Sequence, residues 1–311
     1  MILYIHPQTD MQLKAILPMS LPALIHRLDA PVIGRFHDEW TADEVRRASI
    51  VLMDVHWYLS LKSAIALSYR LKDINPTLRI IAGGLSASLF AKPLLRDSRI
   101  DYIIKGDAEV PLRHLVKALL NGDEAAIART PNLIARDFIS PERYSLTHED
   151  LNASNFRDIA FFPTLEQQIY RYHRIYTEAV TIPVYPYLMV YRGCPLECPA
   201  CCGAMTPQGR LFGRSWILRS AEKVREDLQA WSADPRIHFV NVFHDFVSIL
   251  PLAYTQQVLS EKYTLDVSYE FFDLPTEEQL GLFLGAFSGG KLLFALGRYH
   301  NATHHTVDAA A

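Results

Sequence analysis

The sequence predicts an α/β fold in which a doubly wound parallel sheet is followed by a second α/β region. Short apolar runs alternate with amphipathic stretches over the first 120 residues, and the same alternation resumes at residue 185. The intervening stretch is less regular and is predicted to be a linker region. The expected organisation is therefore a first domain at 1–120, a linker at 121–184 and a second domain at 185–311.

Each element of the first domain follows from its local pattern. Strands are expected where apolar residues run together, at 2–5, 31–36, 50–55, 79–84 and 100–106. Helices are expected around 21–28, 41–48, 61–74, 89–97 and 110–122. Nearly continuous apolar strands separated by helices are typical of a parallel sheet covered on both faces, so this domain is predicted to be Rossmann-like.

Polar residues and glycines gather just after the predicted strands, where ligands of doubly wound sheets bind. These residues are His6, Asp54, His56, Gly83, Gly84, Ser86, Gly106, Asp107 and Glu109. Any one of them could serve only as a turn residue or a helix cap. Because they all fall on one predicted edge of the sheet, together they indicate a ligand site.

Composition and charge exclude several classes of protein. Half of the 311 residues are apolar, 21% are charged and the formal net charge is −3, which indicates a globular chain with a large core. The sequence shows no basic footprint for nucleic acid, no apolar run long enough for a membrane and no secretory signal. A cytoplasmic, reducing setting is expected, which disfavours disulfides.

All four cysteines lie in the stretch RGCPLECPACCG, directly after a predicted strand at 185–193. Cys194, Cys198 and Cys201 form a C-x-x-x-C-x-x-C run, and Cys202 follows at once. Structural zinc ordinarily uses two separated pairs of ligands, and no second cysteine pair exists here, although zinc with a distant histidine stays open. Three thiolates on one tight loop suit an iron–sulfur cluster whose fourth iron is left for another ligand.

At this spacing the sequence resembles the radical S-adenosylmethionine (radical SAM) superfamily. The resemblance implies that Cys194, Cys198 and Cys201 hold a [4Fe–4S] cluster on the loop after the first strand of a (β/α) barrel. It implies further that the open iron binds S-adenosylmethionine, whose reductive cleavage gives a 5′-deoxyadenosyl radical. A small-molecule substrate and an electron donor such as flavodoxin or ferredoxin are the implied partners. Ala200 departs from the family's usual aromatic residue, and Cys202 is expected to be a bystander.

The rest of the second domain fits part of such a barrel. Strands are expected at 237–245, 265–273 and 291–298, with helices at 220–231 and 276–287. In the family a polar stretch after the second strand binds the methionine amino group, and Asp245, with His244, occupies that place here. About four of the family's six units are accounted for, so an open parallel edge, an unusual closure, a partner or a truncated chain is expected. The three histidines near the C-terminus could form a metal patch, but an unstructured, solvent-exposed end is the expectation.

The first domain resembles the cobalamin-binding domain that one branch of the superfamily carries before the barrel. The resemblance implies that Gly83 and Gly84 lie against the cobalamin tail and that Gly106 to Glu109 form the turn after the fifth strand. Asp54 and His56 resemble the D-x-H-x-x-G motif of other cobalamin domains, but they follow the third strand and the final glycine is Leu59. His56 is therefore not expected to ligate cobalt. His6, after the first strand, is better placed but lacks the preceding aspartate.

Two functions follow from these expectations. The first is a cobalamin-dependent radical SAM enzyme that methylates an unactivated carbon or phosphorus. The alternative is a catalytically inactive cobalamin or iron–sulfur binding module with a sensing or assembly role. The intact cysteine run favours the enzyme, and the short barrel favours the module. Nothing in the sequence indicates the substrate.

Overall fold

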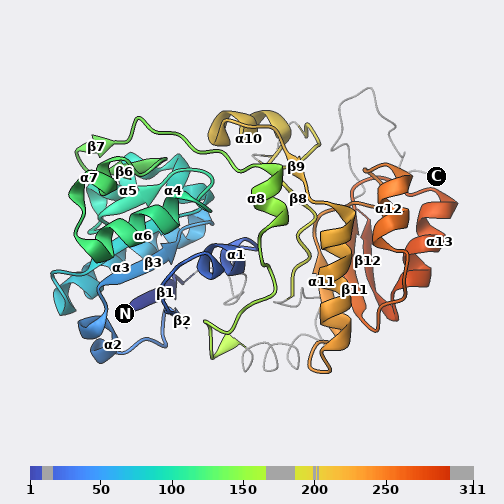
Figure 1. Ribbon diagram of the computed structural model, residues 1–311, viewed down its shortest axis with the longest axis horizontal. Helices are drawn as coiled ribbons and strands as arrows, with labels where there is room; N and C mark the ends of the chain where they lie inside the picture. Colours follow the sequence, from blue (N-terminus) through green and yellow to red (C-terminus); the bar gives the residue numbers. More distant parts are fainter. Residues whose placement is uncertain (9–16, 166–185, 199–200, 202, 295–311) are drawn as a thin grey trace. The chain divides into compact units, whose positions relative to one another are not determined.

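The computed structural model describes residues 1–8, 17–165, 186–198, 201 and 203–294, which form two compact units (Figure 1). Unit 1 is built from the described parts of Met1–Leu146 and Asp158–Gln168, and unit 2 from those of Thr147–Arg157 and Ile169–Ala311. The C-terminal histidines lie outside the described residues. In the described part of the chain, no helix is both long enough and apolar enough to cross a membrane.

Unit 1 is built around a seven-stranded sheet with the order β2-β1-β3-β4-β5-β6-β7. The strands are β1 (Ile2–His6), β2 (Val32–Phe36), β3 (Ile50–Asp54), β4 (Arg79–Gly83), β5 (Tyr102–Ile104), β6 (Leu133–Ala135) and β7 (Phe138–Ile139). The first five are parallel, and β6 and β7 pair antiparallel at one end. The predicted α/β class with a large parallel sheet is thus confirmed. The last two strands come from the predicted linker, where runs of three and two residues carry little periodicity.

Helices connect the parallel strands. They are α1 (Leu21–His26), α2 (Ala42–Arg47), α3 (Leu61–Ile74), α4 (Leu85–Leu89), α5 (Ala91–Asp97), α6 (Pro111–Asn121) and α7 (Glu124–Ala128), with a 3₁₀ turn at Tyr58–Ser60. Helix α2 begins at a capping box in which Thr41 and Glu44 bond each other's backbone N–H groups. Helix α6 ends at Gly122, whose φ of 65° favours glycine.

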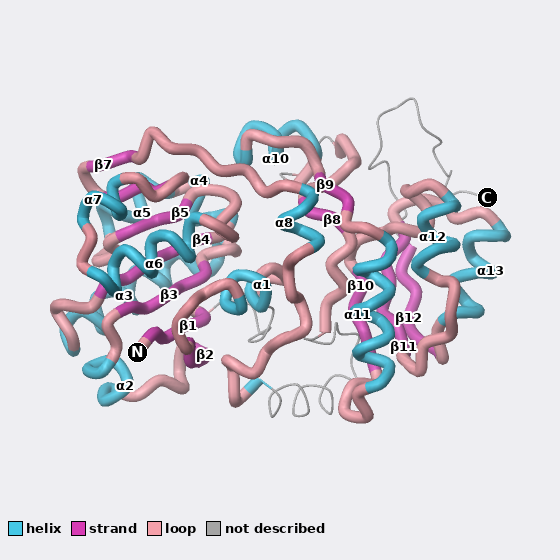
Figure 2. The backbone as a smooth tube through the Cα atoms, in the orientation of Figure 1, coloured by secondary structure: helices cyan, strands magenta, loops and turns pink. Residues whose placement is uncertain are grey.

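The parallel strands of unit 1 lie among helices (Figure 2), and their side chains are largely buried on both faces. Leu3 and Val51 face one side and join a core with residues of α2, α3 and α5. Tyr4 and Leu52 point to the opposite side and are also almost fully buried. With both faces covered, the edge at which the parallel strands end, here called the carboxyl edge, is the natural place for a ligand.

Unit 2 contains a parallel sheet with the order β10-β11-β12 and a short antiparallel pair, β8-β9. The strands are β8 (Tyr191–Arg192), β9 (Ile217–Leu218), β10 (Phe239–Val242), β11 (Asp266–Phe271) and β12 (Gly289–Phe294), and the helices are α8 (His148–Asn152), α10 (Met205–Phe212), α11 (Ala221–Ala233), α12 (Leu252–Val258) and α13 (Glu277–Ala286). The chain before β8 lies beside β10 through a parallel bridge between Tyr187 and Asn241. The cysteine loop therefore follows a segment aligned with this parallel sheet.

A large apolar core supports unit 2, with Trp231, Tyr269 and Phe283 among its buried members. Strand β12 pairs with β11 and leaves most of its own side chains exposed, including Leu293 and Phe294 at 47% and 42%. It is the outer strand of this sheet in the part of the chain that the structure describes. The predicted strand at 291–298 is described only as far as residue 294.

Candidate functional site

The cysteine loop leaves strand β8 through a glycine that no other residue could replace without strain. Gly193 has a φ of 88°, and a Cβ atom there would lie 3.1 Å from the Cα atom of Trp216. Cys194 follows directly. The chain therefore turns sharply at the end of a buried strand and begins the loop close to β9.

Backbone hydrogen bonds fold the loop back on itself. The N–H of Cys201 donates to the carbonyl of Cys198 at 3.1 Å, and the N–H of Met205 donates to the carbonyl of Leu196 at 2.9 Å. The N–H of Gly203 donates to the Cys201 sulfur at 3.3 Å. These bonds keep three cysteines on one short loop. Cys202 and Ala200 lie outside the described residues.

The three thiols fit the thiolate ligands of an iron–sulfur cluster. Burial raises the pKa of Cys194, and the nearby Cys198 and Cys201 raise it further. The pKa of Cys198 is raised by burial and then by Cys201. A cationic metal group would offset the repulsion that raises the pKa of Cys194 and Cys198. Among the described residues, no three metal-binding side chains converge as they would on a single ion. In a cluster each thiolate binds a separate iron, so such convergence is not needed.

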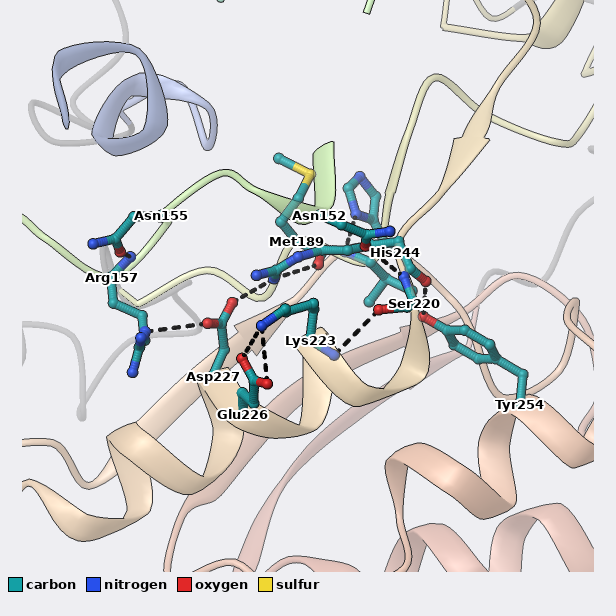
Figure 3. A network of polar contacts seen from close by, with 12 residues as sticks. Asn152, Asn155, Arg157, Met189, Ser220, Lys223, Glu226, Asp227, His244 and Tyr254 are labelled. Carbon is teal, nitrogen blue, oxygen red and sulfur yellow. Dashed lines mark hydrogen bonds and ion pairs between the residues drawn. The ribbon is translucent and has the colours of Figure 1, made fainter. Parts of the chain in front are cut away.

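A buried ion pair fixes the strand that leads to the cysteines (Figure 3). Arg219 donates its backbone N–H to the carbonyl of Val190 at 2.9 Å and its guanidinium to the carbonyl of Met189 at 3.3 Å. Asp227 pairs with Arg219 and, at 3.2 Å, with the half-exposed Arg157. A single arginine after a two-residue strand gave no sequence signal for this role.

Asp245 follows β10 as predicted, and its carboxylate is fully engaged within unit 2. Its Oδ1 accepts hydrogen bonds from the N–H groups of Val247 and Ser248 and from the Tyr269 hydroxyl, at 3.1, 2.9 and 2.8 Å. Its Oδ2 accepts from the Ser248 hydroxyl and, at 2.6 Å, from the Phe272 N–H. The side chain is completely buried, so its visible role is to organise the loops after β10 and β11.

His244 precedes Asp245 in the sequence, and its side chain is less buried than that of Asp245. Its ring stacks on Tyr191 with centroids 4.2 Å apart, and its Nδ1 accepts from the N–H of Val190 at 3.3 Å. Burial, and then the charge of Arg192, lower its pKa to about 3. His244 is therefore neutral at physiological pH and carries its hydrogen on Nε2.

In unit 1 the structure brings Tyr4, His6 and Asp54 together at the carboxyl ends of β1 and β3. Asp54 Oδ1 lies 2.8 Å from His6 Nδ1 and accepts the Tyr4 hydroxyl at 2.5 Å. His6 is 2% exposed, and its Nε2 has no hydrogen-bond partner among the described residues. Tyr4 escaped sequence reasoning, although its position two residues before His6 places both on one face of the strand.

Gly83, Gly84, Ser86 and His56 also meet at this edge. Gly84 has a φ of 106°, and a Cβ there would lie 2.9 Å from the backbone nitrogen of His56. The N–H and hydroxyl of Ser86 both donate to the carbonyl of His56, at 3.3 and 2.9 Å. These residues therefore hold the start of α4 tightly against the chain that follows β3.

The predicted turn at Gly106 is anchored from several directions. Gly106 has a φ of 87° and donates its N–H to the Ser88 hydroxyl at 2.9 Å. Asp107 accepts the N–H of Leu146 at 3.0 Å, and Glu109 accepts that of Ala108 at 3.0 Å. Both acidic side chains are buried. The turn thus ties the end of β5 to the chain that completes unit 1.

Sequence reasoning missed a group of exposed apolar side chains in the segments that follow β3, β4 and β5. The group consists of Trp57, Tyr58, Leu89, Phe90 and Val110, all at least 39% exposed. The segments that leave the carboxyl edge therefore carry exposed apolar side chains.

A cavity of about 780 Å³ lies elsewhere, near the start of β5, and is lined by charged residues. Four of its charges form ion pairs: Lys72 lies 2.9 Å from Asp101, and Arg99 lies 2.9 Å from Asp73. Parallel sheets bind ligands at the opposite edge, so we assign the functional site of unit 1 to the carboxyl edge.

Comparison with known proteins shows which structures this fold resembles. No protein-family model and no curated protein matches the chain. Among solved structures, it matches the radical SAM methyltransferase TsrM from Kitasatospora setae, with tryptophan substrate and a SAM analogue bound, at a TM-score of 0.63 and 15% identity. It also matches the cobalamin-dependent SAM radical enzyme OxsB with aqua-cobalamin bound, at a TM-score of 0.62 and 14% identity.

The chain shares their fold. Each alignment covers 94% of this chain, but only 58% of the TsrM chain and 43% of the OxsB chain. A second TsrM structure, with cobalamin and a [4Fe–4S] cluster bound, matches at a TM-score of 0.61. The resemblance noted from the cysteine run and the strand ends therefore extends to the fold of both proteins.

Proposed function

We propose that the chain is a cobalamin-dependent radical SAM enzyme. In this proposal unit 1 is a Rossmann-like cobalamin-binding domain, and unit 2 is a partial (β/α) barrel that holds a [4Fe–4S] cluster and S-adenosylmethionine. The observation that carries the proposal is the three-cysteine loop directly after a buried strand, in a chain with the fold of TsrM and OxsB. The reaction we favour is methylation of an unactivated carbon in a small molecule.

Cys194, Cys198 and Cys201 would hold the cluster. The bound groups supply the electron that cleaves S-adenosylmethionine and the cobalt that carries the methyl group. The chain's own residues position them. Arg219 fixes the strand before the loop, and Asp245 holds the loops after β10 and β11 in place. His244 can offer a neutral N–H donor beside them, whereas both oxygens of Asp245 are already engaged.

The carboxyl edge of unit 1 would hold the cobalamin. Gly84 allows backbone to approach closely where a side chain would collide, and the exposed rings of Trp57 and Phe90 offer apolar surface for a macrocycle. The residues proposed for this site are Asp54, His56, Gly83, Gly84, Ser86, Gly106 and Glu109. A cytoplasmic location and an electron donor such as flavodoxin or ferredoxin belong to the same proposal.

Anaerobic iron–sulfur reconstitution of the full chain tests the proposal. We expect about four irons per chain and a paramagnetic signal of the reduced cluster that shifts when S-adenosylmethionine is added. Cys198→Ala should lose the cluster, and Cys202→Ala, the matched control, should keep it. A cluster whose signal ignores S-adenosylmethionine would support the inactive binding module instead. Retention of zinc without a cluster would overturn the enzyme proposal.

A further inference from the structure

We propose that Glu270 binds a protonated amine of the small-molecule substrate, and that Phe243 and Leu293, on either side of it, contact the apolar part of the same molecule. The inference rests on the proposed function and deepens it, because it takes the parallel sheet of unit 2 as part of a barrel that holds a substrate. It names a substrate class, an amine with an apolar body, which the cysteine loop does not indicate.

Helices cover one face of the parallel sheet in unit 2. Side chains on that face, such as Val242, Tyr269 and Phe271, join a core with residues of α11, α12 and α13. Successive side chains of a strand point to opposite faces, so Glu270, which lies between Tyr269 and Phe271, points away from this core. In a barrel of alternating strands and helices the helices lie outside, so this second face, here called the inner face, lines the interior.

Strand register assigns the neighbours of Glu270 on the inner face. The pairing of β11 with β12 places Glu270 beside Leu293, which is 47% exposed. The register between β10 and β11, continued one residue past its last described pair, places Phe243 on the other side. The ring of Phe243 in turn packs on that of Tyr187, with centroids 5.5 Å apart. Glu270 is therefore an acid in a row of apolar side chains near the end of the sheet.

No described residue neutralises Glu270. Its side chain is partly buried, and among the described residues none forms an ion pair or a hydrogen bond with its carboxylate. Lys291, its diagonal neighbour on β12, is exposed and does not pair with it. Burial, and then the negative charge of Asp245, raise the pKa of Glu270. A bound cation would offset both effects.

A second polar group on the inner face also lacks a partner. Leu188 belongs to the core on the helix side, so Tyr187, the residue before it, points to the inner face. Tyr187 is 5% exposed, and its hydroxyl has no hydrogen-bond partner among the described residues. Burial raises its pKa, so the hydroxyl keeps its proton. Unpartnered buried polar atoms are rare in native proteins, and a polar ligand on this face would satisfy this one.

The proposed contact is a charge-assisted hydrogen bond. The ammonium group donates an N–H to the Glu270 carboxylate, the proton stays on the amine, and no covalent bond changes. The ring of Phe243 attracts the same cation, and the side chain of Leu293 covers hydrocarbon next to it. A ligand with a carboxylate in place of the amine would be repelled.

Binding of three small probes to the full chain tests the proposal. Phenethylamine carries the ammonium group, phenethyl alcohol has nearly the same shape without the charge, and hydrocinnamate carries a negative charge. Isothermal titration calorimetry gives each dissociation constant, for the chain as purified and after cluster reconstitution. We expect the amine to bind about tenfold more tightly than the alcohol. Hydrocinnamate should bind more weakly than either.

Variants assign the amine preference to one side chain. Glu270→Gln should remove the advantage of the amine and leave the affinity for the alcohol unchanged. Asp266→Asn is the matched control, because Asp266 lies on the same face of β11 and is exposed, and it should keep the advantage. Lys291→Ala should not weaken amine binding, since the lysine does not pair with Glu270.

Stability separates binding from a structural role. Because no described partner is lost, Glu270→Gln should unfold in urea at the same or a higher concentration than the wild type. Glu270→Met serves as a second variant with the same expectation. A marked loss of stability in both variants would overturn the proposal, because the carboxylate would then have a structural partner within the protein.

S-adenosylmethionine also carries a protonated amine, so the source of the amine needs its own test. The titration with phenethylamine is repeated on the reconstituted chain with S-adenosylmethionine at saturation. We expect the affinity for phenethylamine to stay the same. Its displacement would overturn the assignment to the substrate, because Glu270 would then bind the methionine amino group.

The outcomes separate this inference from the proposed function. Equal affinity for the amine and the alcohol, or an advantage that persists in Glu270→Gln, overturns the inference and leaves the enzyme proposal intact. Absence of a cluster overturns the proposed function. The titration of the chain as purified then still decides whether Glu270 binds an amine.

Discussion

Two aspartates lie at or just beyond the end of a parallel strand, one in each unit, and they differ in their hydrogen-bond partners. Asp54 ends β3 in unit 1, and Asp245 lies just beyond β10 in unit 2. Both are buried, and each accepts a hydrogen bond from a tyrosine on the adjacent strand, Tyr4 or Tyr269. Asp245 accepts four further bonds from neighbouring loops, whereas Asp54 bonds to a histidine whose outer nitrogen has no partner among the described residues.

A buried carboxylate at a strand end is therefore not a binding residue by position alone. At Asp245 the described bonds come from the loops after β10 and β11 and from Tyr269 of β11, so the carboxylate stabilises the ends of the sheet. At Asp54 the bond passes to His6, so the carboxylate orients a group that can still bind something. Hydrogen-bond partners, rather than residue type, separate a structural role from a functional one.

The largest expected effect tests this contrast directly. Asp245→Ala removes the acceptor of five buried or partly buried hydrogen bonds and should lower the stability of unit 2 by about 4 kcal/mol. Asp54→Ala removes the partner of two groups and should cost unit 1 about 2 kcal/mol. Urea unfolding followed by hydrogen exchange of amides in β10 and β3 reports the two units separately. Equal losses in the two variants would contradict the structural role of Asp245.

The tyrosines give a smaller version of the same test. The Tyr269 hydroxyl also accepts the N–H groups of Phe246 and Val247, at 2.8 and 2.9 Å. Tyr269→Phe removes the described acceptor of the Phe246 N–H, leaves the Val247 N–H with its bond to Asp245 alone and takes one donor from Asp245, so it should cost about 3 kcal/mol. Tyr4→Phe removes only one donor to Asp54 and should cost about 1 kcal/mol. Similar losses, measured by the same amide exchange, would mean that the bonds to Phe246 and Val247 contribute little.

How much the sequence could predict differs between these features. The alternation of apolar strands and helices located β1 to β5, because buried parallel strands lie in nearly continuous apolar runs between amphipathic helices. The short strand β9 was not predicted, since two residues show no periodicity. The helix expected at 89–97 is divided at Phe90 into α4 and α5 by a local break in conformation that propensity does not reveal.

For the candidate sites, too, the sequence predicts local features but not contacts between distant segments. Strand ends can be predicted from the sequence, so Asp54, Gly84 and Asp245 could be chosen as candidates. The pairing of side chains cannot be predicted in this way, because the partners come from other strands. Asp54 pairs with His6, and Asp245 pairs with Tyr269. The cysteine loop was found because its ligands are local, and the Arg219 ion pair was missed because its partners are not.

Gly84, which follows β4 in unit 1, and Gly193, which follows β8 in unit 2, allow a further comparison. A Cβ at Gly84 would lie 2.9 to 3.0 Å from backbone atoms of Val55 and His56, and one at Gly193 would lie 3.1 Å from the Cα of Trp216. Both have positive φ, so Gly84→Ala should cost about 3 kcal/mol and Gly193→Ala about 2 kcal/mol. Gly122→Ala, with φ of 65° and open space around it, is the control at about 1 kcal/mol. A Gly84 variant no worse than Gly122 would show that the α4 contact is loose.

The smallest expected effect is a pH dependence that distinguishes the two histidines. His244 has no carboxylate partner among the hydrogen bonds described for it, and burial lowers its pKa from 6.5 to about 3. The unfolded chain therefore binds a proton that the folded chain does not. This contribution is complete above the unfolded pKa and is lost as pH falls from 6.5 toward 3. At pH 5.5 the loss is about 1.4 kcal/mol relative to pH 8.

His244→Asn isolates that contribution, because its side-chain oxygen keeps an acceptor for the Val190 N–H while the titration disappears. Urea unfolding of unit 2 at pH 8 and pH 5.5 should show a stability difference for the wild type that exceeds that of His244→Asn by the stated amount. Other groups titrate equally in both proteins and cancel. Identical pH slopes would mean that His244 accepts a proton in the folded state, which its stacking on Tyr191 and its bond from Val190 oppose.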